Sequence, residues 1–186
     1  MYIGFLERIA RSLDERNIRY MVIGGQAVVL YGEPRLTKDI DITLGTDPSM
    51  LPYVIDVCSE LGLHVIPTNP DEFVQETYVL PADDPVTGFS VKFIFSDSRY
   101  EQEALSRAAS FVVRDYHVKY ATAEDVIIHK VIANRPRDEE DIRSILRRTP
   151  GMNQEYILGW LKEFDTGLHT NYVRKYEDLW ADSVNL

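Results

Sequence analysis

Two glycines and two aspartates, placed at the ends of neighbouring short segments, constrain the fold of this chain most. Gly24 and Gly25 directly follow a short apolar segment, and segment 39–44 alternates polar with apolar residues. The first pattern predicts a short buried strand that ends in a tight turn, and the second predicts a strand with one polar face. Because Asp39 and Asp41 are two residues apart on that strand, both carboxylates project from the same face.

This combination is typical of a site for a metal–nucleotide complex. Two carboxylates on one strand face suit Mg²⁺, which binds one or two carboxylates and otherwise keeps water or phosphate oxygens. A glycine pair between a strand and a helix allows the backbone to approach a triphosphate, toward which the helix N-terminus points its N–H groups. Each part alone also has an ordinary explanation: a solvated strand face, a simple turn, and loop charges at Arg35 and Lys38. Their order and spacing together favour the nucleotide site.

Length and composition limit the remaining possibilities. A chain of 186 residues fits one domain, or one domain with a small appendage. The formal net charge of −10 argues against broad binding to long DNA or RNA, which depends on neutralising phosphates. The single cysteine, Cys58, excludes an internal disulfide and is expected to fill the core.

The beginning of the sequence and its hydropathy predict a cytoplasmic protein that does not insert into a membrane. An acid and an arginine occur within the first eight residues, so we expect no signal peptide. No apolar stretch approaches the ~18 residues that a membrane-spanning helix needs.

The hydrophobic periodicity predicts a mixed α/β part followed by an all-helical part. We expect strands at 20–23, 39–44, 89–95, 111–114 and 117–120, and helices at 2–16, 26–31, 47–61, 99–109, 122–134, 138–148, 153–165 and 170–181. Segment 64–89 contains four prolines and predicts loops around one or two edge strands. The predicted domains are therefore an α/β core at 1–120 and a helical C-terminal extension at 121–186, packed on that core.

Two blocks of sequence resemble the DNA polymerase β-type nucleotidyltransferase superfamily. They are similar above all to its small prokaryotic members, including the nucleotidyltransferase components of abortive-infection and other toxin–antitoxin systems. The first block comprises Ile23-Gly-Gly-Gln-Ala27, Tyr31-Gly-Glu-Pro-Arg35 and Thr37-Lys-Asp-Ile-Asp-Ile42. The second resembles the lysine helix and Asp-x-x-Asp segment of the same branch, at 123–133 and 135–142. The resemblance extends over roughly residues 17–165.

The resemblance implies a nucleotidyltransferase fold of the α/β (α+β) class: a mixed twisted β-sheet flanked by helices, with a helical C-terminal extension. It also implies an enzyme that transfers an NMP from an NTP, with ATP as the expected substrate, to a protein or small RNA acceptor. That acceptor would be a cognate toxin or antitoxin partner in a toxin–antitoxin system. By the same resemblance Asp39 and Asp41 hold Mg²⁺, Gly24 and Gly25 contact the nucleotide phosphates, and Lys130 neutralises phosphate charge. From their own charges and positions we also expect Arg35 and Lys38 to bind the nucleotide, and we count Lys92 with Asp39, Asp41 and Lys130 among the candidate catalytic residues.

One position departs from the family pattern. Members of the family usually carry a third carboxylate on the strand after the metal pair, where it helps to bind metal and to activate the acceptor hydroxyl. This chain has Lys92 there. A lysine repels Mg²⁺, but it attracts phosphate, or acts as a base once it has lost its proton. The alternative is that Lys92 only faces solvent. Asp97 is near in sequence but lies beyond the predicted end of the strand.

The departure leaves more than one function open. The first is an active transferase, and the second is a catalytically weakened, nucleotide-binding relative that acts as a partner or antitoxin. Modification of a small cationic drug ranks last, because such enzymes keep the third acid. Asp138 and Asp141 also have two interpretations, as caps of the helix they begin or as site residues. Lys130 either extends its charge to solvent or contacts phosphate.

Overall fold

The computed structural model describes residues 2–34 and 36–184, which divide into two compact units. The first unit comprises Met1–Gln26 and Leu36–Tyr120, and the second comprises Ala27–Arg35 and Ala121–Leu186. Helix α2 (Gly24–Tyr31) therefore begins in the first unit and continues in the second. The division into domains after residue 120 stays a prediction.

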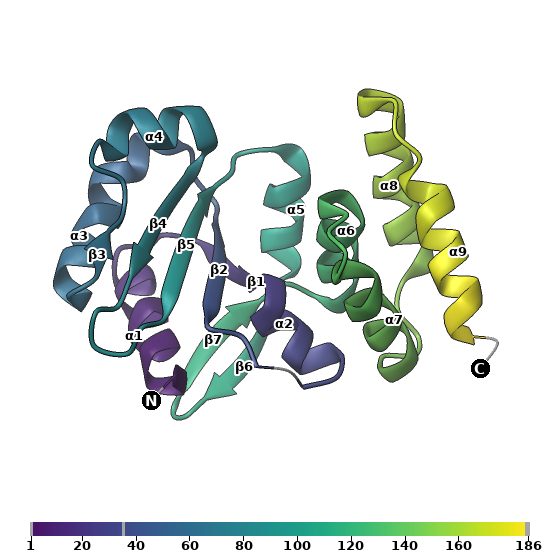
Figure 1. Ribbon diagram of the computed structural model, residues 1–186, viewed down its shortest axis with the longest axis horizontal. Coiled ribbons are helices and arrows are strands. Elements are labelled where there is room, and N and C mark those ends of the chain that lie inside the picture. Colours follow the sequence, from purple (N-terminus) through teal and green to yellow (C-terminus); the bar gives the residue numbers. More distant parts are fainter. Residues whose placement is uncertain (1, 35, 185–186) are drawn as a thin grey trace. The chain divides into compact units, whose positions relative to one another are not determined.

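A mixed seven-stranded sheet organises the described part of the first unit (Figure 1). Its strands are β1 (Tyr20–Ile23), β2 (Asp39–Leu44), β3 (His64–Val65), β4 (Val79–Asp83), β5 (Ser90–Phe95), β6 (Ala109–Val113) and β7 (Tyr116–Tyr120). Their order across the sheet is β3-β4-β5-β2-β1-β7-β6. Strand β2 runs antiparallel to β1 and parallel to β5, so the aspartate strand lies between the glycine strand and the lysine strand.

The strands next to β2 bury one face and leave the other partly open. The residues that point into the core are almost fully buried: Ile40, Ile42 and Leu44 on β2, Val91, Phe93 and Phe95 on β5, and Leu80 and Ala82 on β4. The alternate residues of β4 and β5 are half-buried, as is Asp41 on β2, and Asp39 at the start of β2 is exposed. This alternation follows from the period of two along a strand, and it keeps both aspartates out of the core.

The described residues of the first unit also form four further helices and one 3₁₀ turn. They are α1 (Tyr2–Glu15), η1 (Pro48–Met50), α3 (Leu51–Leu61), α4 (Pro70–Thr77) and α5 (Arg99–Arg107). Asp47 caps η1 by accepting a 2.7 Å hydrogen bond from the Ser49 N–H, so the expected single helix at 47–61 is in fact a 3₁₀ turn followed by a helix. Helix α1 packs against α3 and β7.

Segment 64–89 contains strands, β3 and β4, as expected, but part of the expected loop between them is helix α4. Pro70 is its first residue, where the fixed φ of proline suits a helix and the missing N–H costs no hydrogen bond. Asp71 and Glu72 lie in its first turn, where carboxylates interact favourably with the helix dipole. Only Val74 is buried, so the segment lacks the apolar stripe that reveals a helix in a sequence.

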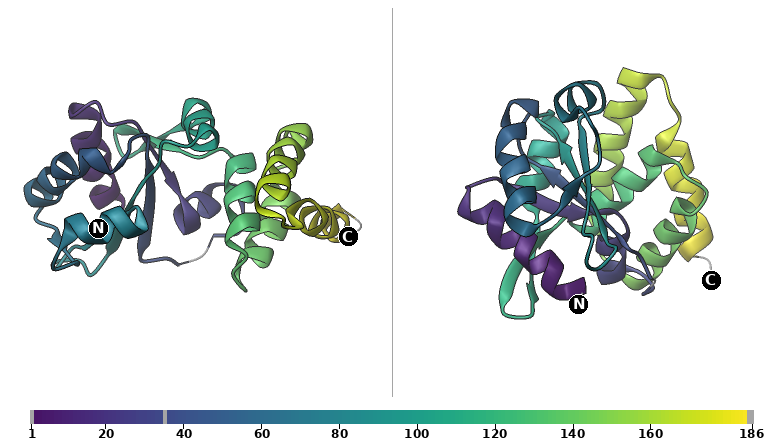
Figure 2. Two further views of the ribbon diagram at one scale, coloured as in Figure 1. Left: turned by 90° about the horizontal axis from the view of Figure 1, so that it is seen from above. Right: turned by 60° about the vertical axis from the view of Figure 1, so that its left-hand side comes forward.

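The second unit is helical, as predicted. Besides most of α2 it contains α6 (Ala123–Ala133), α7 (Asp138–Arg148), α8 (Gln154–Leu168) and α9 (Tyr172–Val184). Helix α9 packs against α7 and α8, as the green and yellow ribbons of Figure 2 show. Thr122 caps α6 by accepting a hydrogen bond from the Asp125 N–H. Within the residues that the structure describes, no helix has the length and hydropathy needed to cross a membrane.

The position of Cys58 yields the first testable prediction. Its thiol lies on the buried face of α3, and burial raises its pKa to about 12. Because the thiolate is the reactive form, we expect the native protein to resist 5,5′-dithiobis(2-nitrobenzoate) at mildly alkaline pH. Absorbance should report one thiol per chain only after a denaturant is added. Rapid reaction of the native protein would contradict the buried position of this side chain.

Candidate active site

The strand register brings the two aspartates and Lys92 together. On β2 and β5, Asp39 lies opposite Ser90, and Asp41 lies opposite Lys92. The Ser90 hydroxyl donates a short hydrogen bond to Asp39 Oδ1. Lys92 Nζ lies 3.7 Å from Asp41 Oδ1, with 45% of the lysine side chain and 21% of the aspartate side chain exposed. The predicted carboxylate pair is therefore formed on one face, and Lys92 contacts it rather than facing only solvent.

Gly24 packs directly against Asp41, one of the two carboxylates. The antiparallel register of β1 and β2 places Ile23 opposite Asp41, so the chain turns into α2 beside the Asp41 side chain. Gly24 has φ +63°, and a Cβ built on it would lie 3.2 Å from Asp41 Cβ and Cγ and closer still to Oδ2. Glycine is therefore required at this position both by the backbone conformation and by the lack of space.

The beginning of α2 adds donors to the same region of the first unit. The first N–H groups of a helix have no acceptor within the helix, and the helix dipole favours an anion at that end. Helix α2 begins at Gly24 and Gly25. Lys38 is exposed directly before the Asp39 strand. Arg35, the other predicted nucleotide ligand, lies outside the described residues.

The carboxylate oxygens of Asp39 and Asp41 suit a hard cation such as Mg²⁺. These two carboxylates alone do not complete its coordination. Among the described residues, no group of three or more His, Cys, Asp and Glu side chains is arranged to hold a metal. Asp97 does not complete the set, because Phe95 lies opposite Leu44 at the far end of β2 and Asp97 follows Phe95. At about 3.3 Å per residue, Asp97 is on the order of 16 Å along the chain from Lys92. Water and phosphate oxygens would fill the remaining positions around Mg²⁺.

Lys130 lies in the second unit, in a buried ion cluster. Its ammonium lies 2.7 Å from Asp138 Oδ1 and 2.6 Å from Asp141 Oδ2. All three side chains are less than 10% exposed. Asp138 Oδ2 also accepts a 2.9 Å hydrogen bond from the Arg135 N–H, so the cluster ties α6, the turn after it and α7 together.

Asp138 and Asp141 take part in this ion cluster and do not cap α7. Arg137 occupies the position before α7, and no side chain caps that helix; Asp138 is its first residue. Both acids instead hold Lys130. The Lys130 ammonium therefore does not extend into solvent. Its contact with phosphate stays a prediction, because a phosphate would have to compete with the carboxylates of Asp138 and Asp141 for the ammonium.

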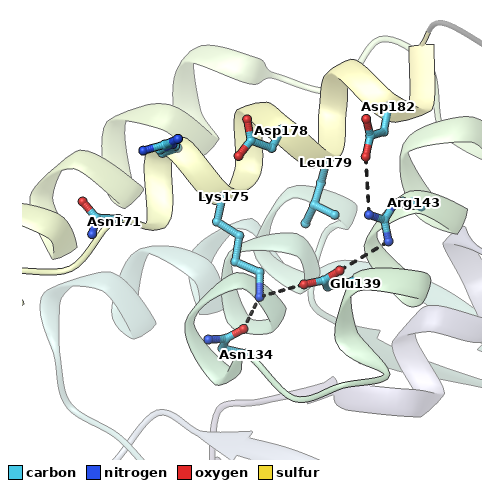
Figure 3. A pocket seen from close by; sticks show the side chains of 9 residues that line it. Asn134, Glu139, Arg143, Asn171, Lys175, Asp178, Leu179 and Asp182 are labelled. Atoms are coloured by element: carbon cyan, nitrogen blue, oxygen red, sulfur yellow. Dashed lines mark hydrogen bonds and ion pairs between the residues drawn. The ribbon is translucent and has the colours of Figure 1, made fainter.

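A polar pocket in the second unit was not predicted from the sequence. It has a volume of about 460 Å³ and lies between α7 and α9 (Figure 3). Glu139 links Arg143 and Lys175 at 3.5 Å each, and Arg143 reaches Asp182 at 3.5 Å. In the sequence, each of these residues has the pattern of a charged residue on a solvent-exposed helix face. Only the packing of α9 against α7 brings them together.

Comparison with known proteins establishes the family. Residues 2–184 match a family described as "Nucleotidyl transferase of unknown function (DUF2204)". The chain belongs to this nucleotidyltransferase family. The match covers nearly all of the chain and confirms both the superfamily and the enzyme class that the sequence motifs predict. No curated protein matches the chain.

Solved structures confirm the nucleotidyltransferase fold. The lincosamide antibiotic adenylyltransferase LnuA, solved with lincomycin, is 15% identical with a TM-score of 0.56, over 78% of this chain and 97% of that one. The antibiotic-resistance factor ANT(2″)-Ia is 17% identical with a TM-score of 0.54, over 97% and 90%. A nucleotidyltransferase-like protein from Paracoccidioides brasiliensis is 15% identical with a TM-score of 0.55, over 90% and 89%. At these identities the likeness is one of fold alone.

The contact between Gly24 and Asp41 can be tested by a pair of alanine substitutions. Gly62 also has a positive φ, +71°, but a Cβ there would meet no atom within 4 Å. Both Gly24→Ala and Gly62→Ala impose the left-handed strain of roughly 1–2 kcal/mol, and only Gly24→Ala also displaces the Asp41 side chain. We expect Gly24→Ala to lower the free energy of unfolding in urea by at least about 1 kcal/mol more than Gly62→Ala. Equal losses would contradict the packing described for Gly24.

The buried cluster around Lys130 predicts a large stability effect. Lys130→Met leaves two buried carboxylates without their cation, which costs about 3–5 kcal/mol in free energy of unfolding. Lys162→Met on the exposed part of α8 is the control and should change stability by less than about 0.5 kcal/mol. Urea unfolding followed by circular dichroism measures both. If Lys130→Met unfolds at the same urea concentration as the wild type, Lys130 does not hold these helices together.

Proposed function

We propose that this protein is a Mg²⁺-dependent nucleotidyltransferase that moves an NMP from an NTP, with ATP as the expected donor, to a protein or RNA acceptor. The packing of Gly24 against Asp41 carries the proposal, because it joins the beginning of α2 to a pair of metal-binding carboxylates. A nucleotide that meets the N-terminal N–H groups of α2 with its phosphates then has these carboxylates beside it. The proposal places the reaction in the cytoplasm.

Each residue has a defined part in this proposal. Asp39 and Asp41 hold Mg²⁺, which, when bound, neutralises the charge that develops on the phosphates. Gly24 and Gly25 allow the backbone to approach the triphosphate, and Lys38, together with the predicted Arg35, adds positive charge. The acceptor attacks the α-phosphorus, a new P–O bond forms, and the bond to the β-phosphate breaks as pyrophosphate leaves.

The contact between Lys92 and Asp41 favours a second candidate function. An ammonium 3.7 Å from a metal-binding carboxylate weakens the attraction of that carboxylate for Mg²⁺. The second candidate is therefore a nucleotide-binding relative with little transfer activity, which acts as the partner or antitoxin of a toxin. A role in a toxin–antitoxin system is part of both candidates, and it rests on the resemblance of the sequence motifs.

Labelling with nucleotides separates the two candidates. Wild-type protein incubated with α-³²P NTPs, Mg²⁺ and cell lysate should label an acceptor. Asp39→Asn and Asp41→Asn should each reduce labelling roughly a hundredfold or more, because each removes charge stabilisation at the reacting phosphates. Asp97→Asn, an exposed acid beyond the far end of β5, is the matched control and should label like the wild type.

Two outcomes decide against transfer. Equal labelling by the wild type and both aspartate variants, or no labelling at all, would contradict the transferase proposal. Calorimetric binding of Mg·ATP without labelling, together with a tight partner in a pull-down, would support the second candidate.

A further inference from the structure

The carboxylate pair has two different sides. On β1, Ile23 lies opposite Asp41 and is followed by Gly24; on β5, Lys92 lies opposite Asp41. The proposed function assigns the glycine side to the nucleotide phosphates. The second reactant then enters from the Lys92 side.

The sheet leaves a surface on the Lys92 side. Strands β5 and β4 continue the sheet beyond β2, and Pro81 lies opposite Lys92 on β4. The residues of this face are half-buried, in contrast to the fully buried opposite face: Ser90, Lys92 and Ile94 on β5, and Val79, Pro81 and Asp83 on β4. An acceptor therefore meets a surface that carries Lys92, whose ammonium lies 3.7 Å from Asp41, and one acid, Asp83.

The chemistry of these residues limits the group that attacks. A hydroxyl or amine must give up a proton, and its base must lie within hydrogen-bond reach. The ammonium of Lys92 has three donors and no acceptor, and the Ser90 hydroxyl already donates to Asp39. Asp39 and Asp41 serve as metal ligands in the proposed function. Asp83, the other acid of this face, lies opposite Ser90 on β4, one strand farther from β2, and its carboxylate already contacts His64 Nδ1 at 3.0 Å. A nucleophile that carries no proton avoids the need for a base.

We propose that Lys92 selects an acceptor that attacks through an oxyanion, either a terminal phosphate or a carboxylate. This inference rests on the proposed transfer reaction. A lone pair of the oxyanion forms the new bond to the α-phosphorus, and the electron pair of the broken α–β bond leaves with pyrophosphate. No proton moves. A phosphate acceptor yields a phosphoanhydride, and a carboxylate acceptor yields an acyl nucleotide.

The chain contains a matched control for Lys92. Lys119 on β7 has a side chain 46% exposed and lies 3.7 Å from the Asp14 carboxylate, compared with 45% and 3.7 Å for Lys92 and Asp41. Lys92→Gln and Lys119→Gln therefore each remove one half-exposed strand lysine from a single carboxylate. Only Lys92→Gln removes it from the candidate site.

Binding is measured first, by titrating inorganic phosphate into the protein in the presence of Mg²⁺ and α,β-methylene-ATP. Hydrogen bonds to charged groups contribute about 1.5–3 kcal/mol, so Lys92→Gln should weaken phosphate binding at least roughly tenfold. Lys119→Gln should bind phosphate like the wild type. If Lys92→Gln retains wild-type phosphate affinity, or if both variants weaken it equally, the inference is wrong.

Product formation identifies the oxyanion. With ATP and ³²P-labelled phosphate the product is ADP labelled at its β-phosphate; with acetate it is acetyl-adenylate, trapped by hydroxylamine; with glycerol, the hydroxyl control, it is glycerol-AMP. The inference is supported if the wild type transfers AMP to phosphate or to acetate and Lys92→Gln does not. Which of the two products forms identifies the oxyanion. Transfer to glycerol alone, at equal rates in the wild type and Lys92→Gln, overturns the inference and leaves the proposed transferase standing. Failure of the wild type to bind Mg·α,β-methylene-ATP overturns both.

Discussion

The pairing register of β1, β2 and β5 is the constraint on which the candidate site depends. Antiparallel pairing sets Ile23, and so the turn at Gly24, beside Asp41; parallel pairing sets Lys92 on the other side. A shift of one residue would turn every side chain of β2 to the opposite face, burying both carboxylates and exposing Ile40. The burial of the apolar side chains therefore fixes the pairing register of the strands, and this register fixes the positions of the candidate site residues.

The local parts of this arrangement could be predicted from the sequence because they follow local rules. Alternation over 39–44 indicates a strand with a polar face, and the glycines after β1 indicate a tight turn. The strand bounds of β1 and β2 are those predicted, and Thr122 begins α6 as expected of a helix cap. These local rules predict that the glycine pair and the aspartate pair belong to one site.

Other parts depend on contacts between residues that are distant in the sequence, and no local pattern reveals them. The contact of Lys92 with Asp41 requires parallel pairing of two strands separated by two helices and another strand pair. The Lys130 cluster requires α7 to fold back on α6, so its acids resemble helix caps in the sequence. The sequence does not indicate helix α4, because this helix begins at a proline and buries little apolar surface.

In the proposed reaction Asp39 and Asp41 bind a divalent metal together with a nucleotide, even though Lys92 lies beside them. Electron paramagnetic resonance of Mn²⁺, used in place of Mg²⁺, measures this binding without any acceptor. With α,β-methylene-ATP present, the wild type should take up Mn²⁺ in excess of the nucleotide alone, and Asp41→Asn should lose that uptake. If Asp41→Asn binds as much Mn²⁺ as the wild type, the two aspartates do not form the metal site.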